Sequence, residues 1–110
     1  MGVANTVIHD LNEYQRILKE HPLVIVLFTS PSCSACLGAD KKFNAVAEKY
    51  AGRVKSLLLD PSQTPRIDEV DGTPTLLVYE KGDRVEILHG IGAPDEQQNL
   101  LECVFSDYAP

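Results

Sequence analysis

The feature that most constrains the fold is a continuous apolar run at residues 23–28, which reads Leu-Val-Ile-Val-Leu-Phe. A strand with one face in water alternates apolar and polar residues, whereas this run has no polar position. It therefore predicts a central strand that is covered on both faces. Because a sheet buried on both faces needs helices on each side, the rest of the chain must supply helices to two layers.

Strand and helix patterns alternate along the remainder of the 110 residues. The other predicted strands cover residues 3–8, 54–59, 75–79 and 84–88, and residues 80–83 have the composition of a hairpin turn. The predicted helices cover residues 10–19, 33–50, 66–70 and a final segment from Pro94 onward. The resulting order, βαβαβαββα, predicts an α/β fold in a single domain, residues 1–110, with a mixed central sheet flanked by helices.

Apolar residues at helical spacing predict the buried faces of three of these helices. They are Leu11, Tyr14, Ile17 and Leu18 in the first, Ala39, Phe43, Val46, Ala47 and Tyr50 in the second, and Leu100, Leu101, Val104, Phe105 and Tyr108 in the last. Cys103 falls outside the last of these stripes, at 100° per residue. It is therefore expected to be partly exposed.

The sequence Cys33-Ser34-Ala35-Cys36 stands where the apolar run gives way to the predicted helix 33–50. A helix that begins at Cys33 directs free backbone N–H groups and its positive dipole end at that sulfur, which favours the thiolate. A thiolate attacks disulfides, and a second cysteine three residues later can displace what the first has captured.

The same spacing also fits half of a zinc or iron–sulfur site, or a structural disulfide. The histidines, His9, His21 and His89, have neither paired spacing nor clustering, so we expect no metal. An odd total of three cysteines and the lack of an apolar N-terminal signal segment favour a reducing compartment, and we expect a cytoplasmic location.

Charge and hydropathy argue against two classes of partner. The chain carries 16 acidic and 10 basic residues, a formal charge of −6, whereas binding to nucleic acid or to anionic membranes calls for a basic face. No apolar stretch approaches the roughly 18 residues that a membrane-spanning helix requires. We therefore expect neither nucleic acid nor membrane as a partner.

Four features together resemble the thioredoxin family. They are residues 28–36 at the strand-to-helix junction, the sequence Asp-Gly-Thr-Pro-Thr-Leu-Leu at 71–77, the Lys-Gly-Asp hairpin at 81–83, and a glycine followed by an acidic C-terminal helix. The resemblance implies a thioredoxin fold, with Cys33 as the exposed nucleophile and Cys36 as the buried resolving thiol.

The resemblance also implies substrate-binding residues. It gives Thr73 a backbone that pairs with the substrate chain, and it makes the Thr73–Pro74 bond cis, where the alternative is an ordinary trans turn. It further implies a glycine that lies close beside the site. Either Gly90 or Gly92 fits that description, and we assign Gly92.

The implied function is thiol–disulfide exchange with protein substrates. The implied electron donor is of the thioredoxin-reductase type, and we expect a monomer without a cofactor. Two alternatives stay open: a glutaredoxin-like, glutathione-coupled enzyme, and a binding or chaperone-like module with weak redox activity.

The chain also departs from the family pattern. It contains no tryptophan, and Ser-Ala replaces Gly-Pro between the two cysteines. The family's buried aspartate and its lysine partner fall on Leu27 and Ser56, and Gly38 stands near the position of the proline that bends the long helix. Because either charge alone would be costly to bury, losing both together is physically coherent.

Overall fold

The computed structural model describes residues 3–4, 11–30, 36, 38–50, 52–60, 72–93 and 95–109. Its elements are β1 (Val3–Ala4), α1 (Leu11–Glu20), β2 (Leu23–Phe28), α2 (Ala39–Lys49), β3 (Lys55–Leu59), β4 (Thr75–Glu80), β5 (Asp83–Leu88) and α3 (Gln97–Tyr108). This order confirms the predicted one within the described ranges. The predicted helix at 66–70, residues 5–8 of the first predicted strand and residue 10 of the first predicted helix lie outside them.

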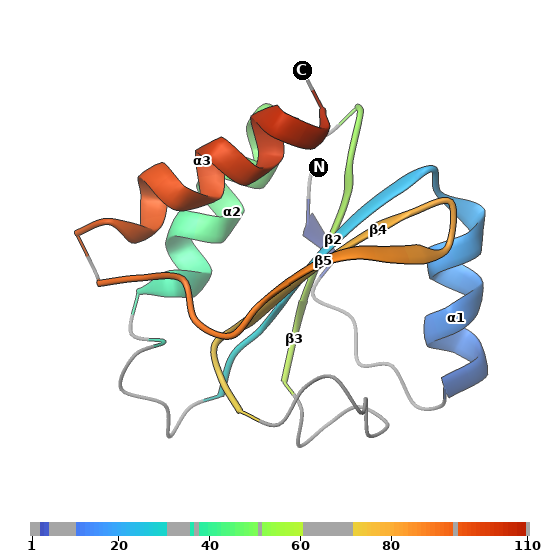
Figure 1. Cartoon of the computed structure of the whole chain (residues 1–110), viewed down its shortest axis with the longest axis horizontal. Coiled ribbons are helices and arrows are strands. Elements are labelled where there is room, and N and C mark those ends of the chain that lie inside the picture. The colour runs from blue at the N-terminus through green and yellow to red at the C-terminus, as the bar shows by residue number, and fades with distance from the viewer. Residues whose placement is uncertain are drawn as a thin grey trace.

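The five strands form one mixed sheet in the order β1-β3-β2-β4-β5. β3 runs parallel to both β1 and β2, whereas β4 is antiparallel to β2 and β5 is antiparallel to β4. Helices α2 and α3 cover one face of the sheet and α1 covers the other, as Figure 1 shows. The predicted two-sided covering of the central strand is therefore confirmed.

Strands β4 and β5 form the predicted hairpin. Lys81 and Gly82 connect them, with φ angles of 54° and 87°. Two consecutive residues at positive φ are typical of a type I′ turn, whose twist matches that of the paired strands. A register shift lies between Val78 and Tyr79, so the pairing is irregular near the turn.

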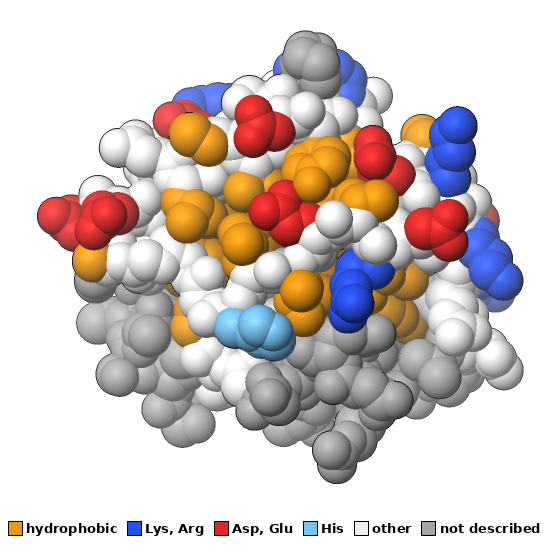
Figure 2. All heavy atoms as spheres, in the orientation of Figure 1, with side chains coloured by type: hydrophobic (Ala, Val, Ile, Leu, Met, Phe, Trp, Pro, Cys, Tyr) orange, Lys and Arg blue, Asp and Glu red, His pale blue; other side chains and the backbone are white. Residues whose placement is uncertain are grey.

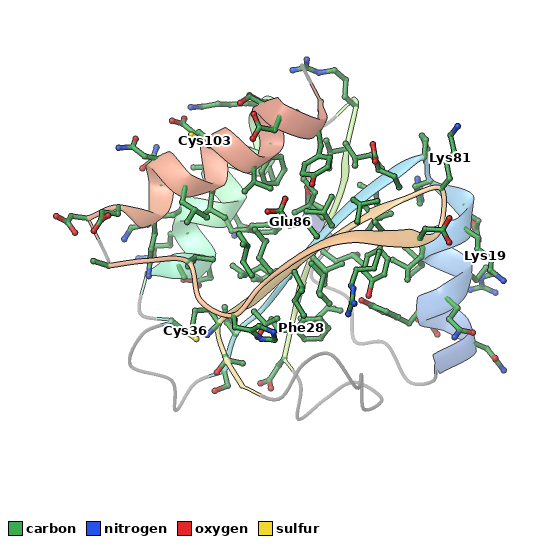
Figure 3. All side chains as sticks on the ribbon, viewed as in Figure 1. Lys19, Phe28, Cys36, Lys81, Glu86 and Cys103 are labelled. Carbon is green, nitrogen blue, oxygen red and sulfur yellow. The ribbon has the colours of Figure 1, made fainter. Side chains whose placement is uncertain are left out.

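β5 is an outer strand of the sheet and faces solvent over much of its length. The hydroxyl of Tyr108, in the last turn of α3, donates a 2.7 Å hydrogen bond to the Glu86 carboxylate of β5. Glu86 lies between the two elements in Figure 3. On this face, hydrophobic side chains gather near the middle with acidic side chains among them (Figure 2).

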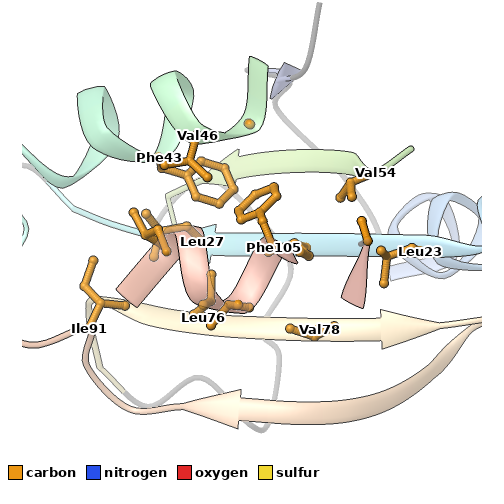
Figure 4. Packing of buried hydrophobic residues seen from close by; sticks show 14 of the residues in the cluster. Leu23, Leu27, Phe43, Val46, Val54, Leu76, Val78, Ile91 and Phe105 are labelled. Atoms are coloured by element: carbon orange, nitrogen blue, oxygen red, sulfur yellow. The ribbon is translucent and has the colours of Figure 1, made fainter. Parts of the chain in front are cut away.

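The side chains of β2 alternate between two hydrophobic cores. The α2/α3 core contains Leu23, Ile25, Leu27, Ala39, Phe43, Val46, Ala47, Val54, Leu76, Val78, Ile91, Leu101, Val104, Phe105 and Ala109 (Figure 4). The α1 core contains Tyr14, Leu18, Val24, Val26, Phe28, Leu57, Leu59, Leu77 and Tyr79. All six residues of β2 are buried, because each core takes every second side chain.

Two helices begin later than predicted. A continuous helix from Cys33 to residue 50 is wrong, since Gly38 has a φ of 77° and α2 begins only at Ala39. A residue in this left-handed region interrupts a right-handed helix, so Gly38 precedes α2 instead of bending it. Likewise α3 begins at Gln97, and residues 95 and 96 form a turn ahead of it. The N–H groups of Glu96 and Gln97 both donate to the Ala93 carbonyl there.

Within the described ranges, no helix is both long enough and apolar enough to span a lipid bilayer.

Candidate active site

Several predicted site residues meet at one end of the sheet. β2 ends at Phe28, which pairs with Thr75 at the start of β4, and β5 ends at Leu88, which pairs with Leu76. The chain that follows β2, the chain that precedes β4 and the chain that follows β5 therefore share this end. It brings together Cys36, Thr73, Pro74 and the loop of residues 90–93.

Cys36 is buried, with 7% of its surface exposed, in a 3₁₀ conformation ahead of α2. It takes part in a disulfide. Cys33, the predicted nucleophile, lies outside the described residues. The buried position of Cys36 fits a thiol that a protein substrate does not reach directly.

Cys103 is free and exposed on α3, as its spacing predicts. Figure 3 shows it well away from Cys36. Cys103 therefore does not belong to the group of residues around Cys36.

The Thr73–Pro74 peptide bond is cis, which confirms that prediction. Pro74 is buried and Thr73 is partly exposed at the same end of the sheet as Cys36. The hydroxyl of Thr75 donates a 2.7 Å hydrogen bond to the Gly72 carbonyl, which fixes the chain on either side of the bond. The role of Thr73 in pairing with a substrate chain stays a prediction.

Gly90 and Gly92 both lie in the loop that follows β5, with φ angles of 120° and 89°. Among the described residues, a Cβ atom added at Gly90 would meet nothing within 4 Å, and one at Gly92 would lie 3.7 Å from Glu96 Cβ. The positive φ angles favour glycine at both positions, since side chains rarely adopt this backbone conformation. The assignment of Gly92 as the glycine beside the site stays a prediction.

Gln97 is a buried polar residue that the sequence analysis missed. Its side chain is 0% exposed and lies at the N-terminus of α3. Its Oε1 accepts a hydrogen bond from Lys42 Nζ at 3.3 Å, and its Nε2 donates one to the Gly92 carbonyl at 3.3 Å. The available signal was its spacing of four, seven and eight residues from Leu101, Val104 and Phe105, which places it on the buried face.

Leu27 and Ser56, which the resemblance predicts to stand at the positions of the family's charge pair, are both 0% exposed. Leu27 pairs with Leu58 and Ser56 pairs with Ile25, so the two residues are diagonal neighbours on one face of the sheet. The Ser56 hydroxyl has no hydrogen-bond partner in the part of the chain that the structure describes. An aspartate at position 27, as in the family pattern, would therefore be buried beside Ser56 without a charged partner there.

Two further polar residues lie at the end of the sheet that carries Cys36 and Pro74. Asp60 follows β3 and is partly buried, and His89 follows β5 and is exposed. Among the described residues, no three His, Cys, Asp or Glu side chains form a group that could hold a metal ion.

The comparisons with known proteins agree with this geometry. The thioredoxin family model matches residues 5–104. A thioredoxin of Porphyra purpurea is 28% identical over 102 residues, which are 90% of this chain and 92% of that protein. A chloroplastic M-type thioredoxin of Brassica napus is 31% identical over 77 residues, but these are 67% of this chain and only 44% of the Brassica protein.

Solved structures show the same fold at lower identity. The thioredoxin of Malassezia sympodialis gives a TM-score of 0.80 at 12% identity and covers 100% of this chain and 96% of its own. That of Plasmodium falciparum gives 0.78 at 20% identity, with 99% of this chain and 100% of its own covered. The chain therefore has the thioredoxin fold and, by its family match, belongs to the thioredoxin family of thiol–disulfide oxidoreductases.

Proposed function

We propose that the protein reduces disulfides in protein substrates, with Cys33 as the attacking thiol and Cys36 as the resolving thiol. The observation that carries the proposal is the placement of Cys36. It is buried and disulfide-bonded at the end of the sheet where the cis Thr73–Pro74 bond and the loop of residues 90–93 also lie.

The reaction consists of two thiol–disulfide exchanges. First, the Cys33 thiolate attacks one sulfur of the substrate disulfide, which forms a mixed disulfide and releases one substrate thiolate. Next, the Cys36 thiolate attacks the Cys33 sulfur, which forms the Cys33–Cys36 disulfide and releases the second substrate thiolate. A donor of the thioredoxin-reductase type then returns two electrons and two protons to the protein.

Substrate binding in this proposal uses the segment before β4. The Thr73 backbone pairs with the extended substrate chain, and the Gly90–Gly92 loop borders the same surface. The proposed surroundings are a reducing compartment such as the cytoplasm, where the dithiol form is maintained.

The test is the reduction of insulin disulfides in the presence of dithiothreitol. Cys33→Ser is expected to abolish catalysis in this assay. In a separate incubation without dithiothreitol, Cys36→Ser is expected to accumulate a mixed disulfide, because capture survives and resolution does not. Cys103→Ser is the matched control and should retain wild-type activity, since that thiol is exposed on α3.

Two results would contradict the proposal. Wild-type activity near the dithiothreitol background would leave a binding module as the better description. Trapping of substrate by Cys33→Ser, and not by Cys36→Ser, would reverse the two roles.

A further inference from the structure

We infer that Gln97 is a positioning residue that clamps the loop of residues 90–93 to α2 and thereby sets the affinity for the substrate chain. The part that concerns substrate affinity rests on the proposed function. The clamp itself rests on the contacts of Gln97.

The loop is held at three points. The Ile91 side chain is 1% exposed and packs in the α2/α3 core. The Ala93 carbonyl accepts N–H groups from the start of α3. Between these points, the Gly92 carbonyl accepts the hydrogen bond from Gln97 Nε2.

The other end of the Gln97 amide reaches α2. Its Oε1 accepts the hydrogen bond from Lys42 Nζ. Lys42 lies in the first turn of α2, where its backbone N–H donates to the Gly38 carbonyl, and Cys36 is two residues before Gly38. The amide therefore joins the segment that carries the resolving thiol to the loop that borders the substrate surface.

An amide side chain suits both partners. A lysine ammonium can only donate and a backbone carbonyl can only accept, so the residue between them must accept at one atom and donate at the other. A carboxylate of the same size could accept from Lys42 but could not donate to Gly92. Because the side chain is fully buried, water does not replace a lost bond easily.

The decisive variant is Gln97→Glu, which keeps the size and the bond to Lys42 but removes the donor to Gly92. Gln98→Glu is the matched control, because Gln98 is the next residue, is exposed, and undergoes the same change of charge. Lys42→Met removes only the α2 half of the clamp. Gln97→Met removes both halves without adding a buried charge, and it replaces Gln97→Glu if that variant does not fold.

Two readouts are measured on each folded variant. The first is hydrogen exchange of the backbone amides of residues 90–93, which should become about tenfold faster in Gln97→Glu while the amides of β2 stay unchanged. The second is the steady-state reduction of a protein disulfide. KM should rise by about three- to tenfold with kcat within about twofold, and alkylation of Cys33 by iodoacetamide should keep its rate.

Gln98→Glu should leave both readouts at wild-type values, and Lys42→Met should shift them in the same direction as Gln97→Glu but less. Loop exchange in folded Gln97→Glu equal to that in Gln98→Glu overturns the clamp. Faster exchange with an unchanged KM overturns its link to substrate affinity. If the wild type reduces no disulfide, the proposed function fails, and the exchange measurement still decides the clamp.

Discussion

The two cores of this protein treat their buried polar groups differently. In the α1 core the hydroxyls of Tyr14 and Tyr79 are hydrogen-bonded to each other at 3.2 Å, and their rings meet edge to face. In the α2/α3 core the Ser56 hydroxyl has no hydrogen-bond partner within the described ranges, and the Gln97 amide donates to the Gly92 carbonyl in the loop after β5. The two tyrosine hydroxyls of the α1 core thus bond to each other, whereas the Gln97 amide of the α2/α3 core bonds to the loop of residues 90–93.

The largest expected effect comes from charging each core in turn. Leu27→Asp places a carboxyl in the α2/α3 core and Val26→Asp places one in the α1 core, both at 0% exposed positions. Each should lower the free energy of unfolding by about 3–5 kcal/mol at pH 7, because an unpaired buried charge is poorly solvated. Adding Ser56→Lys should restore part of that loss for Leu27→Asp only, since Ser56 and Leu27 share a face.

Chemical denaturation of the single and double variants measures this comparison. Burial should raise the pKa of the carboxyl that Leu27→Asp introduces, so this variant should be relatively more stable in acid and lose stability as the pH rises toward and through that raised pKa. Single-turnover kinetics of Leu27→Asp should show faster resolution at higher pH, because the carboxylate can accept the Cys36 proton. Equal rescue of both acidic variants by Ser56→Lys would show that the two cores do not differ in this way.

Removing one hydroxyl from each core should change stability in opposite directions. Tyr14→Phe breaks the bond to Tyr79 and should cost about 1 kcal/mol. Ser56→Ala removes a buried hydroxyl without a partner in the described ranges and should stabilise the fold by about 0.5–1 kcal/mol. Thermal and urea unfolding measure both changes, and a loss of stability in Ser56→Ala would mean that the hydroxyl is satisfied in solution.

A smaller effect is expected where α3 meets β5. The hydrogen bond to Glu86, followed by burial, raises the pKa of Tyr108 from 10.0 to about 12. The contribution of this hydrogen bond to the free energy of unfolding is therefore complete below pH 10, the pKa of tyrosine in the unfolded chain. It is lost as the pH rises toward 12, the pKa of Tyr108 in the folded protein. Glu86→Gln should return the Tyr108 pKa toward 10, as read from tyrosinate absorbance with Tyr108→Phe as the reference for assignment.

The smallest effect is expected between α2 and α3. Lys49 and Glu102 form an exposed ion pair, and the hydrogen bond and charge of Glu102 raise the pKa of Lys49. Glu102→Gln should lower that pKa, as measured by NMR titration, and move the melting temperature by no more than about 1 °C, since solvent and salt screen exposed pairs. A larger change in melting temperature would mean that this pair contributes to the α2–α3 contact.

The sequence predicted those elements whose residue pattern is compatible with only one local structure. The run at 23–28 has to be buried on both faces, and the glycine at 82 suits the positive φ of the hairpin turn. Helix starts were less predictable, because the sequence does not reveal whether Gly38 bends a helix or precedes it. That choice depends on how the segment before α2 packs.

The candidate site was predictable as a set of residues but not as an arrangement. Spacing and resemblance selected Cys33, Cys36, Thr73 and Pro74, and the register of the sheet placed the described ones at one end. Gln97 escaped notice because a glutamine on an apolar stripe is ordinarily interpreted as a polar residue at its margin. Its two hydrogen bonds depend on a lysine 55 residues earlier and on a loop carbonyl, and neither is evident from local pattern.

The exposed position of β5 has a consequence for association between molecules. An outer strand with free backbone groups can template the addition of a strand from another chain. Here a partner strand would have to approach charged side chains at Asp83, Arg84 and Glu86, and Glu86 already accepts the bond from Tyr108. The irregular pairing at Val78 and Tyr79 also interrupts the regular β4–β5 ladder. The carboxylate that accepts the bond from α3 is thus also one of the charges that a strand added to this edge would have to accommodate.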